Sequence, residues 1–195
     1  MATVPVTDRF ITVVSGLPRS GTSLMMQMLA AGGLPALTDG FRTPDESNPR
    51  GYLEYEPVKK LRSDRSWLEL ARGHAVKIIH LLLRELPTDR GLQYRVLLIR
   101  RPLEEVLASQ RAMLERQGKK AGDDALLAKV YRGQLEQAEQ WLASAPGFSV
   151  LEVEHHALFE SASPTVERLN EFLGGQLDVT AMLGVIDPTL YRQRL

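Results

Sequence analysis

Four short runs of apolar, often β-branched residues alternate along the chain with longer stretches of helical spacing. Each run is typical of a buried β-strand, and the four lie at residues 10–15, 75–80, 95–100 and 148–154. The apolar spacing between and after them predicts helices at residues 22–31, 58–71, 102–118, 124–145 and 163–173. Because strands alternate with helices, we predict a parallel sheet covered on both faces: an α/β three-layer sandwich.

The 195 residues fit one domain, spanning 1–195, with no internal repeat. Residues 35–57 contain four prolines and many polar residues, so they predict a long loop, which in a compact domain favours a functional lid. Ligands of open parallel sheets bind beyond the carboxyl ends of the strands. We therefore expect the residues just after Ser15, His80 and Arg100 to converge on one site.

Composition narrows the classes of function. Lys plus Arg and Asp plus Glu both number 24, so no global basic field indicates a nucleic-acid partner. The chain has no cysteine, which excludes disulfides, thiolate metal sites and a cysteine nucleophile. It has no apolar run of about 18 residues and no signal-peptide pattern at its start, so we expect no membrane span and a cytoplasmic location. The oligomeric state is left open.

The segment VVSGLPRSGTSLMMQML, residues 13–29, has the outline of a phosphate-binding loop between a strand and a helix. Gly16 and Gly21 have the spacing of a Walker A loop, but Thr22 stands where that loop has its lysine. Arg19 is the nearby cation, and its planar guanidinium suits phosphate or sulfate oxygens. With no lysine and no obvious aspartate after a strand, a magnesium-dependent ATPase is disfavoured.

The sequence GLPRSGTSLMMQML resembles the 5′-phosphosulfate loop of sulfotransferases that use 3′-phosphoadenylyl sulfate (PAPS). The resemblance implies the P-loop NTPase-like sulfotransferase fold. It also implies that Arg19 binds the 5′-phosphosulfate and stabilises charge on the transferring group. The cofactor-binding residues it implies in this loop are Pro18, Arg19, Ser20, Gly21, Thr22 and Ser23. With arginine at position 19, this loop is more similar to that of the tyrosylprotein and bacterial branches than to that of the cytosolic small-molecule branch, which uses lysine.

A second match lies in LLIRRPLEEVLASQ, residues 97–110. The family binds the 3′-phosphate with an arginine at a strand end and a serine eight residues later. Arg101 is followed at that distance by Ser109, whereas Arg100 is followed by an alanine, so both arginines stay candidates beside Ser109. Residues 150–174 resemble the family's strand, acidic loop and closing helix. The glycine-rich C-terminal motif of the family is absent, and the chain ends DPTLYRQRL.

Two residues are candidates for the general base, which must take a proton from the acceptor. His80 ends the second predicted strand, near the expected site. Glu54 lies in the long loop, where the tyrosylprotein branch has its base, with Tyr52 and Tyr55 to line an acceptor pocket. Lys77 is a candidate to neutralise the leaving group. No metal is expected, since His155 and His156 have no further ligands at suitable spacing.

The leading hypothesis is an enzyme that moves a sulfuryl group from PAPS to a hydroxyl or amine acceptor. Two alternatives remain: a P-loop kinase or nucleotide phosphotransferase with a degenerate loop, and a catalytically silent nucleotide-binding module.

Overall fold

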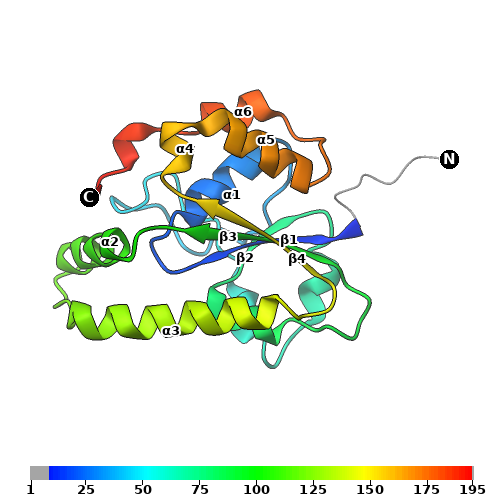
Figure 1. Cartoon of the computed structure of the whole chain (residues 1–195), viewed down its shortest axis with the longest axis horizontal. Coiled ribbons are helices and arrows are strands. Elements are labelled where there is room, and N and C mark those ends of the chain that lie inside the picture. Colours follow the sequence, from blue (N-terminus) through cyan, green and yellow to red (C-terminus); the bar gives the residue numbers. More distant parts are fainter. Residues whose placement is uncertain (1–8, 195) are drawn as a thin grey trace.

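The computed structural model describes residues 9–194 and contains a four-stranded parallel sheet (Figure 1). Its strands are β1 (Ile11–Gly16), β2 (Ala75–Lys77), β3 (Tyr94–Arg100) and β4 (Phe148–Glu154). They lie side by side in the order β2-β1-β3-β4, and every neighbouring pair is parallel. The predicted α/β architecture is therefore confirmed.

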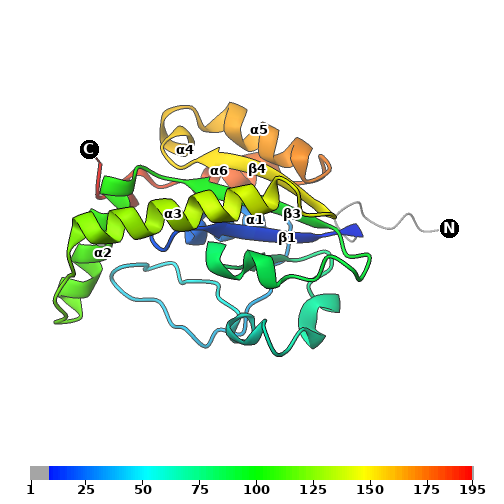
Figure 2. The same cartoon turned by 60° about the horizontal axis from the view of Figure 1, so that its bottom comes forward.

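Successive residues of the strands contribute their side chains alternately to two separate apolar cores, because side chains alternate between the two faces of a sheet. On one face, Val14 and Leu97 pack against α1 (Thr22–Ala31), α5 (Ala162–Phe172) and α6 (Val179–Gly184). On the other face, Val13 and Val96 pack with residues of α3 (Asp124–Leu142) and of the segment between α1 and β3. Figures 1 and 2 show these two layers, with α1, α4 (Ala157–Glu160), α5 and α6 on one side of the sheet and α3 on the other.

Most predicted elements form where the sequence places them. Helix α1 and strand β4 have the predicted bounds, and α2 (Leu103–Arg116) follows Pro102, which is its N-cap residue. Asp123 caps α3, because its carboxylate accepts from the backbone N–H groups of Ala125 and Leu126. Within residues 9–194, no helix is long and apolar enough to cross a membrane.

The helix predicted over residues 58–71 is wrong. Two short 3₁₀ helices, η2 (Glu56–Lys60) and η3 (Ser66–Glu69), occupy that stretch instead. The Asp64 side chain accepts hydrogen bonds from both the backbone N–H and the hydroxyl of Ser66. This local turn competes with helical hydrogen bonding and separates the two pieces.

The second predicted strand is shorter than expected, since β2 ends at Lys77 and the 3₁₀ helix η4 (His80–Glu85) starts three residues later. The pairing of β2 with β1 covers three positions, at which Ala75, Val76 and Lys77 lie opposite Thr12, Val13 and Val14. The weakly periodic tail also forms more structure than predicted, namely α6 and the 3₁₀ helix η5 (Pro188–Leu190).

Candidate functional site

The loop between β1 and α1 depends on glycine at both ends. A Cβ atom at Gly16 would lie 2.6 Å from Ser20 Oγ and 2.8 Å from the backbone oxygen of Ile99. Gly21 has φ of 105°, and a Cβ there would lie 2.3 Å from Cδ2 of His155. The two positions therefore require glycine for space as well as for backbone conformation.

The N-terminus of α1 opens towards the inside of this loop. Its N-cap residue is Gly21, which has no side chain to cap the helix, so the first backbone N–H groups are left for another acceptor. Thr22 and Ser23 add two hydroxyl groups in the first helical turn. Unpaired N–H groups at the positive end of a helix dipole form a site suited to an anion.

Arg19 stands at the centre of the loop with a left-handed backbone, φ 70°. Its Nε donates to Oγ of Ser109 at 3.1 Å, and its NH2 donates to the backbone oxygen of Ser47 at 3.2 Å. Burial lowers the pKa of its guanidinium from the ordinary value, and the neighbouring Arg101 adds to that effect. Arg19, which belongs to the glycine loop, thus connects that loop to two other parts of the chain, the long loop of residues 35–57 and α2.

The two adjacent arginines at the end of β3 point to different places. Arg101 is almost fully buried, and its Nε pairs with the carboxylate of Glu105 at 2.8 Å. Its NH1 donates to the backbone oxygen of Arg19 at 3.0 Å, and its NH2 donates to that of Gln193 at 2.8 Å. Arg100 instead forms ion pairs with Glu139 at 2.5 Å and Glu152 at 3.2 Å. Of the two candidates, Arg101 is the one that meets the glycine loop.

A cavity of about 440 Å³ lies over the carboxyl ends of the strands, where the sheet rule places a ligand. Most of the predicted site residues line it: Pro18, Arg19, Gly21, Thr22, Ser23, Glu54, Arg101 and Ser109. Three predicted residues are absent from this lining within the described chain, namely Ser20, His80 and Arg100. Ser20 belongs to the loop, but its side chain is buried next to Gly16.

His80 is buried below the glycine loop rather than beside the cavity. Its Nδ1 lies 3.2 Å from the backbone oxygen of Gly16, and its Nε2 lies 3.0 Å from the side-chain oxygen of Gln134. Both ring nitrogens therefore have protein partners. The reason is the early end of β2, which turns the chain into η4 and carries His80 under the loop. This placement suits support of the loop better than proton transfer to a bound acceptor.

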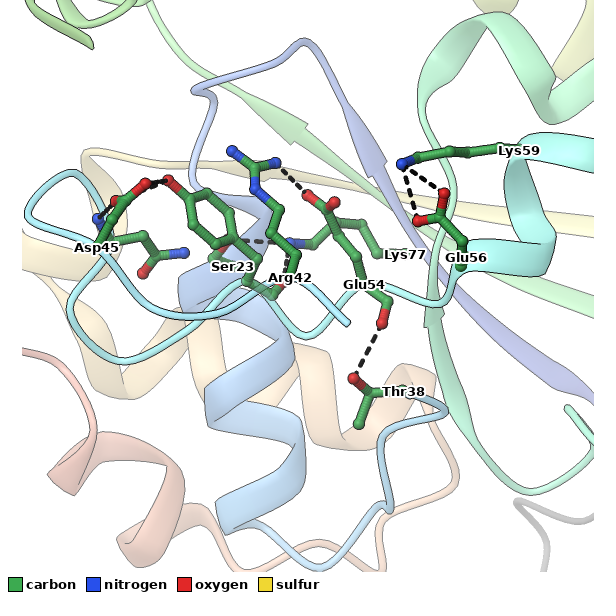
Figure 3. Close-up of polar contacts among 10 residues, drawn as sticks. Ser23, Thr38, Arg42, Asp45, Glu54, Glu56, Lys59 and Lys77 are labelled. Atoms are coloured by element: carbon green, nitrogen blue, oxygen red, sulfur yellow. Dashed lines mark hydrogen bonds and ion pairs between the residues drawn. The ribbon is translucent and has the colours of Figure 1, made fainter. Parts of the chain in front are cut away.

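Glu54 lines the cavity and belongs to a polar network of the long loop (Figure 3). Its Oε1 accepts from NH1 of Arg42 at 2.8 Å, and that guanidinium lies 3.4 Å from the centre of the Tyr52 ring. Tyr52 in turn hydrogen-bonds Asp45 at 2.8 Å through its hydroxyl. The long loop thereby fixes the carboxylate at the cavity wall.

Lys77 comes from the end of β2 and reaches the first turn of α1 (Figure 3). Its Nζ donates to Oγ of Ser23 at 2.9 Å and also to the backbone oxygen of Tyr52. Burial lowers the pKa of Lys77 to about 8, an effect that Glu54 partly offsets. At neutral pH it therefore adds a second cation close to the helix N-terminus.

His155 lines the cavity, although the sequence predicts no role for it. It follows directly after β4, so the rule that sites lie beyond strand ends points to it as well. Its ring lies 4.8 Å from that of Tyr191 and 5.1 Å from that of Phe159. Burial lowers its pKa to about 3, so the imidazole is neutral at ordinary pH.

The C-terminal segment closes one side of the cavity, which the sequence did not predict. The Tyr191 hydroxyl hydrogen-bonds Glu105 at 2.8 Å, and Arg192 donates to the backbone oxygen of Glu46 at 3.0 Å. Arg50 pairs with Asp187 at 2.9 Å. Among residues 9–194, no group of three or more His, Asp or Glu side chains is arranged to hold a metal ion.

Comparison with known proteins identifies the fold. No protein-family model matches the chain, and no curated protein matches its sequence. One solved structure, the sulfotransferase domain from the curacin biosynthetic pathway, is similar over 91% of this chain and 78% of its own, with a TM-score of 0.53 and 12% sequence identity. The fold is that of a sulfotransferase. The fold implied by the PRSGTS loop is thereby confirmed.

Proposed function

We propose that the protein transfers a sulfuryl group from PAPS to a hydroxyl or amine acceptor. The observation that carries this proposal is the pair of cationic positions in one cavity, Arg19 at the uncapped start of α1 and Arg101 beside it after β3. PAPS carries charge at two ends, the 5′-phosphosulfate and the 3′-phosphate. A single cavity that is lined by both Arg19 and Arg101 matches that distribution of charge.

The 5′ end of PAPS would lie at the glycine loop. The backbone N–H groups of the first turn of α1 and the hydroxyls of Thr22 and Ser23 would bind its oxygens. Arg19 and Lys77 would stabilise negative charge on the transferring group and on the bridging oxygen as it leaves. Both cations are already held in place by protein hydrogen bonds, so little reorganisation is needed when charge develops.

The 3′-phosphate would lie at Arg101. Its NH2 donates to the backbone oxygen of Gln193 in the C-terminal segment. We infer that the phosphate takes the place of this carbonyl oxygen, since both are acceptors for the same N–H groups. Ser109 lies on α2, where its hydroxyl accepts a hydrogen bond from Nε of Arg19 and so connects the two ends of the site.

Transfer would proceed by attack of the acceptor oxygen or nitrogen on sulfur. As the new bond to sulfur forms, the bond between sulfur and the bridging oxygen breaks, and adenosine 3′,5′-bisphosphate leaves with that oxygen. The acceptor proton goes to Glu54, which lines the cavity on the acceptor side and whose Arg42 partner contacts only Oε1. Glu54 is preferred over His80 as the base because His80 lies outside the cavity lining and both of its nitrogens have partners.

Isothermal titration without magnesium tests the proposal. We expect adenosine 3′,5′-bisphosphate to bind more tightly than adenosine 5′-phosphate, because only the former offers an anion to Arg101. Tighter binding of magnesium ATP would instead support the phosphotransferase alternative. Binding of the bisphosphate without transfer to any acceptor would support the silent binding module.

A further inference from the structure

The part of the cavity around Glu54 is where the proposed function places the acceptor. Two stretches of backbone there contribute first a polar and then apolar lining residues. On one wall, the polar Lys77 is followed in sequence by Ile78 and Ile79, and all three line the cavity. In the long loop, Glu54 is followed by Tyr55, which also lines the cavity. The reacting end, with Lys77 and Glu54, therefore opens directly onto apolar side chains.

These apolar side chains form a continuous wall with the core. Tyr55 and Leu82 are partly buried and pack against the core cluster that contains Val58, Ile78 and Trp67. The Tyr55 ring meets that of Trp67 edge to face, with centroids 5.6 Å apart. The wall is thus firmly supported from behind by the core.

The charged residues near this wall are engaged by other parts of the protein. Arg42 pairs with Glu54 at 2.8 Å, and Lys59 pairs with Glu56 at 2.8 Å. Arg116, across the cavity on α2, donates to the hydroxyl of Ser47 at 3.1 Å. An acceptor bound here would meet mainly apolar surface, apart from the reacting end.

The apolar wall also reaches the protein surface. Ile79 lines the cavity and is 42% exposed, so an apolar surface runs from the interior to solvent at this point. Its neighbour Leu81 is 40% exposed but is not among the lining residues. Exposure of a large aliphatic side chain at the mouth of a cavity favours contact with an apolar ligand.

We propose that the acceptor is an alcohol or phenol with an uncharged, apolar body. This proposal rests on the proposed function and names the substrate class of that site. The hydroxyl lies between Glu54 and the glycine loop, and the apolar body lies along Tyr55, Val58, Leu82 and Ile79. Loss of water from both surfaces supplies the binding free energy.

The proposal is tested by measuring sulfuryl transfer from PAPS to apolar acceptors and to polar or charged ones. We expect 2-naphthol and 1-decanol to be sulfated with a kcat/KM at least tenfold above that for glucose or for a tyrosine peptide flanked by acidic residues. Equal or better turnover of the sugar or the peptide would overturn the proposal.

Ile79→Glu and Leu81→Glu provide a matched pair, since both side chains are similarly exposed and only Ile79 lines the cavity. We expect Ile79→Glu to raise KM for 2-naphthol roughly tenfold or more, with KM for PAPS unchanged, whereas Leu81→Glu matches the wild type. Identical behaviour of the two variants would contradict the proposal. Titration with adenosine 3′,5′-bisphosphate separates this proposal from the proposed function. If the bisphosphate binds and the sugar or the peptide reacts while no apolar acceptor does, the acceptor class is wrong. If it does not bind, or if it binds and no acceptor reacts, the proposed function itself fails.

Discussion

The guanidinium Nε of Arg19 donates a hydrogen bond to the hydroxyl of Ser109 over 3.1 Å, although the two residues are 90 positions apart in the chain. Arg19 belongs to the loop after β1, and Ser109 lies on α2, which follows β3. Adjacent parallel strands bring these two elements to the same edge of the sheet. The contact fixes the direction of the central cation of the site before any ligand arrives.

Replacement of Arg19 by alanine should lower the rate of sulfuryl transfer by about 10²- to 10³-fold, because a positioned donor to the developing charge is lost. Arg19→Lys, which keeps the charge without the planar fork, should have an intermediate rate. Single-turnover kinetics at saturating PAPS separate this effect from weaker binding. Near-normal turnover of Arg19→Ala would show that the arginine has no role in the transition state.

Glu54→Gln should lower the rate of transfer, whereas His80→Gln should lower the stability of the protein. Loss of the proposed base should slow transfer about 10²-fold or more, with little change in thermal stability. His80→Gln should mainly lower the melting temperature, because His80 is buried between Gly16 and Gln134. Parallel measurements of rate and of thermal unfolding check both. A large rate loss in His80→Gln alone would transfer the role of base to His80.

Transfer should depend on the charge of Lys77. Burial lowers the pKa of this residue to about 8, so its cationic form predominates below pH 8 and is lost as the pH rises through that value. We expect kcat to fall above about pH 8 in the wild type. Lys77→Met should have a lower kcat that lacks this alkaline decline, as seen in pH–rate profiles. The same decline in both proteins would assign it to another group.

Arg101→Lys and Arg100→Lys should separate the two 3′-phosphate candidates. Arg101 meets the glycine loop, whereas Arg100 is held by Glu139 and Glu152. The Arg101 variant should bind adenosine 3′,5′-bisphosphate about tenfold or more weakly, since a planar guanidinium binds phosphate better than a lysine does. Its affinity for adenosine 5′-phosphate should barely change. A selective loss in the Arg100 variant would reverse this assignment.

Gly21→Ala should destabilise the protein more than Gly33→Ala. Both glycines have positive φ, 105° and 95°, so alanine costs roughly 1–2 kcal/mol at either position. At Gly33 the added Cβ meets nothing within 4 Å, but at Gly21 it would lie 2.3 Å from His155 Cδ2. We therefore expect an additional loss of about 1–3 kcal/mol for Gly21→Ala. Denaturant unfolding measures the difference, and equal losses would mean that the loop relaxes away from His155.

The local pattern of apolar and polar residues was sufficient to predict most of the fold. The strands alternate side chains between two buried faces, so their apolar runs are visible in the sequence, and the glycines around Arg19 mark the turn into α1. The pattern failed over residues 58–71, where apolar spacing looks helical but the Asp64 side chain forms a turn with Ser66. It also missed α6, whose apolar residues pack against α1 and α5 in the tertiary structure.

The sequence by itself determined the parallel α/β sheet, the glycine loop and the identity of its cation, because each depends on residues that are neighbours along the chain. Only the tertiary structure directed Arg101 to the glycine loop and Arg100 to Glu139, placed His80 under the loop and brought Glu54, Lys77 and His155 to one cavity. A one-residue step along a strand turns a side chain to the opposite face of the sheet, and β2 ends at Lys77, so that the chain enters η4 at His80. Such choices depend on the register of neighbouring strands, which apolar spacing does not encode.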